Sequence, residues 1–187
     1  MIGIVALIIY GCQLKEMQRS SKAAITGLAL SEQMNRIEER AWVAPAGISG
    51  DLEVGKEFRP QVVFKNSGKT FALRMASSIK IELVKKGSDP NFDRVKEPSK
   101  VDDIWSSVLL PPNGQCGSLP DPLEKSPFSQ EQIDSIRDTQ SLFVYGRVSY
   151  ADIFGHYHWT TFCYLYDVRE KTYGYYNKYN EADEDKE

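Results

Sequence analysis

Cysteine and histidine are scarce in this sequence, and their scarcity restricts the chemistry available to it. Three cysteines occur among 187 residues and no two of them form a C-x-x-C pair, so a structural zinc site is not expected. Only two histidines are present, His156 and His158. A phosphate-binding loop is also absent, because Gly114 and Gly117 are not followed by Lys-Ser/Thr.

Charge of one sign is not in large excess either. The formal net charge is -3 at pH 7, which lacks the basic surplus of a nucleic-acid binder, so no nucleic-acid partner is expected. The acidic residues gather near the end, where residues 169–187 are interpreted as a polar, solvated tail. Hydrophobic residues make up 41% of the chain, which is enough to predict a packed core.

Long apolar runs are missing apart from the first fourteen residues. Residues 1–14 read MIGIVALIIYGCQL and carry no charge. As a helix they span roughly 20 Å against the ~30 Å of a bilayer core, so they predict a truncated transmembrane segment that contacts membrane lipid. Two alternatives stay open. The run packs on the soluble domain, or it belongs to a secretion signal whose Ile9-Tyr10-Gly11-Cys12 forms a lipobox, giving an exported lipoprotein anchored through Cys12.

Basic residues follow this run closely and predict its orientation. Lys15, Arg19 and Lys22 come after it, and no basic residue precedes it. The positive-inside rule then predicts a single-pass membrane protein with its soluble domain in the cytoplasm, with the periplasm as the alternative.

Residues 15–40 contain no proline and predict a helical stalk. Its apolar residues keep one stripe as far as Leu28 and a second stripe from Leu30 onward, at spacings of three and four. The shift beside Gly27 interrupts the heptads that a coiled coil requires. Self-association through the stalk and docking of the second stripe on the chain's own β domain are the two interpretations.

Residues 41–168 change to an extended pattern. We expect a short run at 41–43 stopped by Pro45, a glycine-rich turn region at 47–55 and a strand at 58–65. Alternation from Leu73 to Leu83 predicts a further strand, broken near Ser77-Ser78. The later elements are a loop at 85–104, a strand at 106–110, a helix at 130–137 with a Ser129/Gln132 capping box, and a hairpin of 142–150 with 157–166.

These elements predict a mainly β fold, an antiparallel immunoglobulin-like β-sandwich preceded by an N-terminal transmembrane and stalk helix. The segment Val62-Val63-Phe64-Lys65-Asn66-Ser67-Gly68-Lys69 resembles the strand–Asn-x-Gly–strand hairpin of bacterial immunoglobulin-like adhesion modules. Cys116 and Cys163 are interpreted as free buried thiols, with a disulfide in an oxidising compartment as the alternative.

A wider resemblance spans most of the chain. The apolar anchor, the stalk, Glu39-Arg40-Ala41-Trp42-Val43, the Asn66–Lys69 turn and the hairpin motif Tyr150-x-Asp152-x-Phe154-Gly155-x-x-His158-Trp159-Thr160-x-Phe162-Cys163 look like a family of uncharacterised bacterial membrane-anchored proteins. The resemblance implies the architecture and no activity. The chain departs from the family mainly in its very short anchor.

The hairpin carries the candidate metal ligands. His156 and His158 would face the same side of a strand, and Asp152 precedes them in a turn. Two imidazoles and a carboxylate form a recognised metal arrangement. The competing interpretation is that Asp152 bonds its own following backbone and shapes the turn. A thiol–imidazole pair of Cys163 and His158 is disfavoured, because odd and even positions of a strand face opposite sides.

Aromatic residues are dense in the same region, and Tyr and Trp are favoured at protein interfaces. Trp159, Tyr164 and Tyr166 are therefore predicted to form an interaction surface. The leading hypothesis is a non-enzymatic, membrane-anchored protein-interaction module with no cofactor and with a protein partner that the sequence does not identify. The alternatives are a metal-dependent or thiol enzyme using the Asp152, His156, His158 and Cys163 region, and the exported lipoprotein.

Overall fold

The computed structural model describes residues 2–95, 108–120, 123 and 127–183, without the side chains of residues 2–9 and of Cys12. The chain divides into two compact units, residues 1–39 and 40–187. Three predicted features lie outside this description: the side chain of the lipobox cysteine, the first two residues of the strand expected at 106–110, and the last four residues of the tail.

The first unit is one helix, α1 (Ile2–Glu39), in which the apolar run and the predicted stalk are continuous. Its sequence contains no proline that would interrupt the hydrogen-bond ladder. Both apolar stripes are exposed, with Leu14 at 52%, Leu28 at 66% and Met34 at 61% of their full accessible surface. Among the described residues, no helix is both long and apolar enough to cross a membrane.

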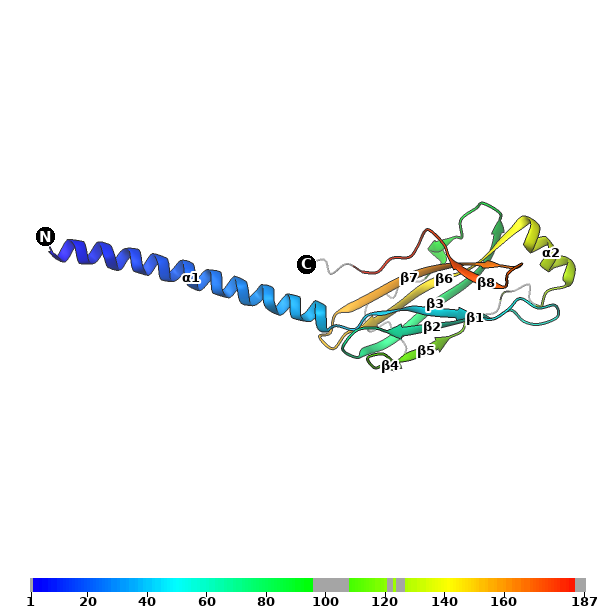
Figure 1. Cartoon of the computed structure of the whole chain (residues 1–187), viewed down its shortest axis with the longest axis horizontal. Helices are drawn as coiled ribbons and strands as arrows, with labels where there is room; N and C mark the ends of the chain where they lie inside the picture. The colour runs from blue at the N-terminus through cyan, green and yellow to red at the C-terminus, as the bar shows by residue number, and fades with distance from the viewer. Residues whose placement is uncertain (1, 96–107, 121–122, 124–126, 184–187) are drawn as a thin grey trace. The chain divides into compact units, whose positions relative to one another are not determined.

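The second unit is mainly β and consists of two antiparallel sheets, which confirms the predicted class (Figure 1). The smaller sheet has the order β1 (Val43–Ser49), β2 (Gln61–Asn66), β5 (Gln115–Ser118). The larger has the order β4 (Val108–Leu110), β3 (Ala72–Lys85), β6 (Gln140–Ala151), β7 (Tyr157–Asp167), β8 (Thr172–Tyr175). A 3₁₀ turn, η1 (Phe92–Arg94), and a helix, α2 (Gln130–Thr139), complete the domain.

The predicted hairpin and helix are confirmed. β6 and β7 pair in continuous register from Leu142↔Tyr166 to Ala151↔Tyr157. α2 begins at the predicted capping box, in which Gln132 N donates to Ser129 Oγ and Ser129 N donates to Gln132 Oε1. Both features are set by neighbours in the sequence, so their patterns are readable without the rest of the fold.

Two local predictions on the strands are wrong. Pro45 does not end a strand, because β1 continues to Ser49 with a register shift between Pro45 and Gly47. β1 is an edge strand, where a residue without an N–H group is tolerated. The irregularity in β3 lies between Leu73 and Ala76, where Arg74 has a φ of 51°, and not at Ser77-Ser78.

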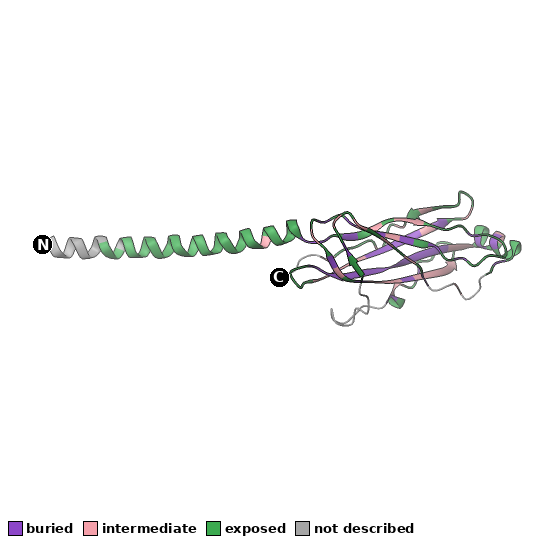
Figure 2. Cartoon of the chain, turned by 90° about the horizontal axis from the view of Figure 1, so that it is seen from below, coloured by how far each residue is buried: buried purple, intermediate pink, exposed green. Residues whose placement is uncertain are grey.

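Two apolar clusters lie on opposite faces of the larger sheet. The main core fills the space between the sheets, where Phe64 of β2 meets Phe162 of β7 edge to face with ring centroids 5.6 Å apart. The second cluster, on the outer face, contains Phe143, Tyr145 and Cys163. β6 is consequently buried on both faces from Leu142 to Ala151. In Figure 2 the buried residues gather in this domain, whereas the described side chains of α1 are exposed except for the half-buried Gln33.

The cysteines are separated by the same sheet. Cys116 and Cys163 are both free thiols. Cys116 packs against the main core and lies 3.6 Å from the Met75 sulfur, whereas Cys163 belongs to the outer cluster. The alternative of a Cys116–Cys163 disulfide is therefore wrong.

Residues 169–183, which the sequence predicts as part of a polar, solvated tail, are ordered against the larger sheet. β8 forms within this range, and residues 176–183, here named the C-terminal segment, return along β7. Tyr176 N donates to Cys163 O, Thr161 N donates to Glu181 O, and Asp183 N donates to Trp159 O. The outer apolar cluster needs a cover, and Tyr176 and Tyr179 of this segment supply it.

A glycine in the Asn66–Lys69 turn allows this turn to approach the start of the sheet domain. A Cβ on Gly68 would lie 2.6 Å from Trp42 N and 2.7 Å from Ala41 Cα, both of them backbone atoms. We predict that Gly68→Ala lowers the free energy of unfolding by about 1–3 kcal/mol, because the backbone has to shift to make room. Gly47→Ala is the control, since nothing lies within 4 Å of a Cβ there. Equal chemical-denaturation midpoints for the two variants would contradict the close approach.

Candidate functional site

A group of four ionisable side chains, three of them buried and the fourth, Asp183, partly exposed, lies at one end of β7. It consists of Arg40, Asp152, His158 and Asp183 and is named the His158 cluster. His158 is only 2% exposed, and each of its ring nitrogens meets a carboxylate. Nε2 lies 3.1 Å from Asp152 Oδ2, and Nδ1 lies 2.6 Å from Asp183 Oδ2. An imidazole that donates to two carboxylates at once is doubly protonated and carries a positive charge, whereas in the neutral form an unprotonated Nδ1 would accept from Arg40 Nη1 and face the Asp183 carboxylate with a lone pair.

Arg40, the first residue of the sheet domain, adds a second positive charge. Its Nη1 is 3.1 Å from His158 Nδ1 and 3.6 Å from Asp183 Oδ2. The guanidinium carbon lies 3.5 Å from the centroid of the Trp42 ring, so the cation is also stacked on an aromatic face. With His158 protonated, two cations face two carboxylates and the buried group is neutral, which reduces the penalty of removing the charges from water.

The pKa values of the cluster follow from these contacts. Burial lowers the pKa of His158, but the hydrogen bonds with Asp183 and Asp152 outweigh burial and raise it above its ordinary value. Burial raises the pKa of Asp183, but its hydrogen bonds with His158 and with the Trp159 N–H outweigh burial and lower it. Both shifts favour the charged forms and therefore stabilise the cluster near neutral pH.

Asp152 connects the cluster to the β6–β7 turn. Its Oδ1 accepts hydrogen bonds from Phe154 N at 2.9 Å and His156 N at 2.8 Å, while Oδ2 faces His158. The interpretation of Asp152 as a turn-forming residue is therefore confirmed. His156 precedes β7 and is exposed, whereas His158 is buried. Asp152, His156 and His158 do not converge, and the described residues include no group of three His, Cys, Asp or Glu arranged to hold a metal ion.

Cys163 lies apart from this cluster. It is five residues from His158 on β7, which is roughly 16 Å along a strand, and it faces the outer apolar cluster. Burial, followed by the charge of Asp89, raises the pKa of its thiol to about 12. The thiol is therefore protonated at neutral pH and is not poised as a nucleophile.

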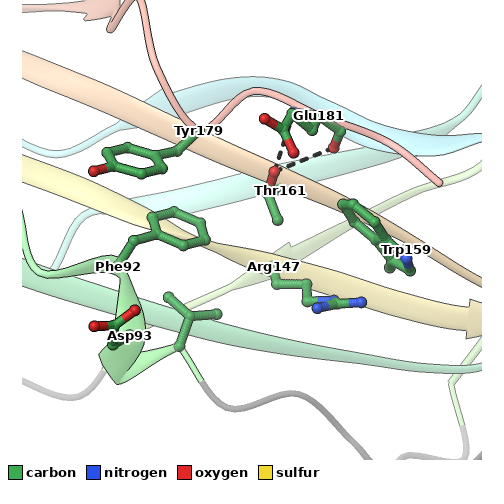
Figure 3. A pocket seen from close by; sticks show the side chains of 8 residues that line it. Phe92, Asp93, Arg147, Trp159, Thr161, Tyr179 and Glu181 are labelled. Carbon is green, nitrogen blue, oxygen red and sulfur yellow. Dashed lines mark hydrogen bonds between the residues drawn. The ribbon is translucent and has the colours of Figure 1, made fainter.

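A pocket of about 410 Å³ opens on the outer face of the larger sheet, beside the cluster (Figure 3). It is named the outer pocket, and its lining residues come from η1, β6, β7 and the C-terminal segment: Phe92, Asp93, Val95, Arg147, Trp159, Thr161, Tyr179 and Glu181. Its volume falls within the range typical of ligand sites.

Two stacked pairs of side chains shape the outer pocket. The Arg147 guanidinium carbon lies 4.3 Å from the centroid of the Trp159 ring, and Arg147 is only 6% exposed. Phe92 and Tyr179 stack with centroids 4.6 Å apart and an interplanar angle of 9°. Thr161 Oγ1 donates to Glu181 O and accepts from Glu181 N, which fixes the segment that carries Glu181 and Tyr179. The walls are thus ordered before any partner arrives.

The structure divides the predicted interaction residues. Trp159 is half-buried and lines the outer pocket. Tyr164 and Tyr166 are each 3% exposed and belong to the main core, so the prediction that they form a contact surface is wrong. Both stand at even positions of β7, which face the smaller sheet, as Phe162 does. The period of two separates Trp159 from these tyrosines, and the sequence alone did not reveal which face was covered.

Sequence reasoning missed Arg40, Asp183 and Arg147. The sequence pattern predicts Arg40 within the helical stalk and Asp183 within the solvated tail. Their contacts with His158 span 118 and 25 residues and leave no local signal. Arg147 offered a usable signal, since an Arg within a long apolar strand needs a partner when both faces of the strand are covered.

Comparisons with known proteins add no further guide to this site. No protein-family model, no curated protein and no solved structure matches the chain.

The His158 cluster predicts a pH-dependent effect of Asp152→Asn. A histidine with a raised pKa contributes stability that is fully present below its unfolded value of about 6.5 and is lost as the pH rises through the folded value. Removing one carboxylate weakens that contribution, so the variant should lose about 1–3 kcal/mol at pH 6 and distinctly less at pH 9. Urea denaturation at the two pH values measures both losses.

Asp167→Asn is the matched control for this prediction. Asp167 Oδ1 accepts from Arg169 N and Glu170 N in the β7–β8 turn, but no imidazole faces it. These hydrogen bonds lower its pKa, so its contribution is present above about pH 4 and is the same at pH 6 and pH 9. If Asp152→Asn also lost the same free energy of unfolding at pH 6 and at pH 9, a protonated His158 would be refuted.

Proposed function

We propose that the sheet domain is a non-enzymatic protein-binding module and that the outer pocket receives a segment of its partner. The observation that carries this proposal is the composition of the pocket, in which Arg147 and three aromatic rings are held in fixed stacks at the protein surface. Arg, Trp and Tyr are the residues that most often dominate binding energy at protein interfaces.

The rigidity of these walls supports the same proposal. Side chains that are already ordered lose little conformational freedom when a partner binds, so more of the contact energy appears as affinity. Charged groups at the rim, Asp93 and Glu181, are exposed and are placed to select a partner rather than to supply most of its affinity. An immunoglobulin-like arrangement of the two sheets belongs to this proposal, supported by their antiparallel pairing and by the Asn66–Lys69 turn.

The membrane location is part of the proposal. Residues 1–14 carry no charge, and burial of their apolar side chains in lipid is favourable. Lys15, Arg19 and Lys22 follow them and favour placement of the sheet domain on the cytoplasmic side. The helix then confines the binding module to the membrane surface, where a membrane-bound partner is concentrated.

Site-specific photocrosslinking tests the binding site. We predict that p-benzoylphenylalanine in place of Asp93, on the pocket rim, forms a discrete adduct with one protein in cells of the native host. The same photoprobe in place of Glu131, an exposed carboxylate on α2, should not form it. Glu181→Lys should lower the adduct yield from position 93 at least roughly fivefold, because reversing a rim charge that selects the partner replaces an attractive contact with a repulsive one, at a cost on the order of 1 kcal/mol or more.

The control for the charge change is Glu170→Lys, which introduces the same change at an exposed position in the β7–β8 turn. Equal adducts from positions 93 and 131, or equal losses for the two lysine variants, would overturn the proposed binding site.

Membrane fractionation tests the anchor. We predict that the full chain sediments with membranes, resists carbonate and is released by detergent. Ile8→Lys together with Ile9→Lys should move most of it to the aqueous fraction, because each lysine in the hydrocarbon core costs roughly 2.5–3.5 kcal/mol. Ser20→Lys with Ser21→Lys adds the same charge outside the apolar run and should leave the distribution unchanged. A wild-type chain in the aqueous fraction would refute the anchor.

A further inference from the structure

One wall of the outer pocket is built from the end of the chain. Tyr179 and Glu181 line the pocket, and both belong to the C-terminal segment. If the segment left β7, the Phe92–Tyr179 stack and the three hydrogen bonds between Thr161 and Glu181 would be lost together. The pocket therefore exists only while this segment stays in place; Figure 3 shows Tyr179 and Glu181 among the side chains that line it.

The far end of the segment is fastened at the His158 cluster. Asp183 Oδ2 lies 2.6 Å from His158 Nδ1, Asp183 Oδ1 accepts from Trp159 N at 3.1 Å, and Asp183 N donates to Trp159 O. Trp159, which stacks on Arg147 in the pocket, is thus bonded directly to the residue that His158 holds. Asp183 therefore joins the charged contact with His158 to Trp159, which lines the outer pocket.

The near end of the segment does not respond to pH between about 5 and 9. Lys178 pairs with Asp89 at 2.6 Å, and Tyr176 Oη donates to the same carboxylate. These contacts lower the pKa of Asp89 and raise that of Lys178, so both groups stay charged throughout this range. Backbone hydrogen bonds of Thr161 and Glu181 carry no titratable group.

His158 is the group whose charge changes within that range. The ionisable side chains that contact it are Asp152 from the β6–β7 turn, Asp183 from the C-terminal segment and Arg40 from the start of the domain. The Tyr150 ring of β6 lies 5.5 Å away, and burial raises the pKa of its hydroxyl to about 12, so Tyr150 stays neutral. A neutral imidazole has a single N–H, which leaves one of the two carboxylates facing a lone pair and the buried cluster with a net negative charge.

We propose that His158 is a positioning residue for the outer pocket: its imidazolium holds Asp183, keeps the C-terminal segment on β7 and so keeps the pocket wall formed. The proposal rests on the proposed function and adds a regulation of partner binding by pH. Binding is strong in mildly acidic to neutral conditions and weakens as the pH rises. The weakening begins above about 6.5, the ordinary pKa of histidine, and is complete once the pH exceeds the raised folded value.

Hydrogen exchange and histidine NMR on the full chain in detergent test this proposal. With only two histidines in the sequence, selective labelling resolves His158 from the exposed His156. The titration midpoint of His158 should lie above the ordinary histidine value of about 6.5. Protection of the Thr161 and Asp183 amides, corrected for intrinsic exchange, should fall as His158 loses its proton. The fall should be about tenfold for each pH unit that separates the pKa of His158 with the C-terminal segment on β7 from its pKa with the segment detached. Amides in the middle of β6 should show no such fall.

Two variants separate a positioning role from a general structural one. Asp183→Asn keeps the shape of the side chain and should lower the His158 midpoint and abolish the pH dependence of Thr161 protection. His156→Gln should change neither. If the Thr161 and Asp183 amides follow the β6 amides at every pH, or if His158 titrates at or below about 6.5, the ordinary pKa of histidine, the proposal is overturned.

The crosslinking assay distinguishes this failure from failure of the proposed function. In wild type, the adduct yield from position 93 should be lower at pH 9 than at pH 6. In Asp183→Asn, the yields at the two pH values should be equal. Together these two results support the regulation. An adduct that persists equally at pH 9 overturns the regulation and leaves the binding site intact. No adduct at any pH overturns the binding site, whatever the amides show.

Discussion

A strand that is apolar on both faces has to be covered on both, and β6 imposes this requirement on the whole sheet domain. Its residues from Leu142 to Ala151 are all buried. The smaller sheet covers one face and supplies Phe64 and Val62 to the main core. The other face is covered by η1 and the C-terminal segment, which add Phe92, Tyr176 and Tyr179 to the outer cluster.

The outer cover explains where the candidate sites are found. A segment that lies across a sheet leaves gaps where its side chains are spaced widely, and the outer pocket lies between η1 and the C-terminal segment. Asp183 also holds the segment on β7, because it contacts a buried histidine and an arginine. Buried ion pairs contribute little net stability compared with apolar packing but define one arrangement of the groups they join.

Much of the sheet domain could be predicted from the sequence because its signals are local. The β6–β7 hairpin, the α2 capping box and the turn-forming role of Asp152 depend on residues within a few positions of one another. The parts that failed depend on contacts across the fold. Tyr164 and Trp159 look alike in the sequence, and only the position of the smaller sheet makes one a core residue and the other a pocket wall.

The end of the chain was misjudged for the same reason. An acidic tail is normally solvated. Nothing within the residues from Asn180 to Asp183 indicates that they hydrogen-bond to the strand β7 and to a buried imidazole. Arg40 looked like the last residue of an exposed helix, although it is 2% exposed. Charge partners separated by more than a hundred residues leave no periodic signal.

The contact of Arg40 with His158 and Asp183 also decides how the sheet domain bears mechanical load. Tension carried along the chain from Glu39 enters the domain at Arg40, which is fastened to the strand β7 and to the C-terminal segment before β1 begins. Without that fastening, the pull would peel the edge strand β1 from β2 one hydrogen bond at a time. With it, the first load falls on the His158 cluster, so the contacts of Arg40 have to break before β1 can separate from β2.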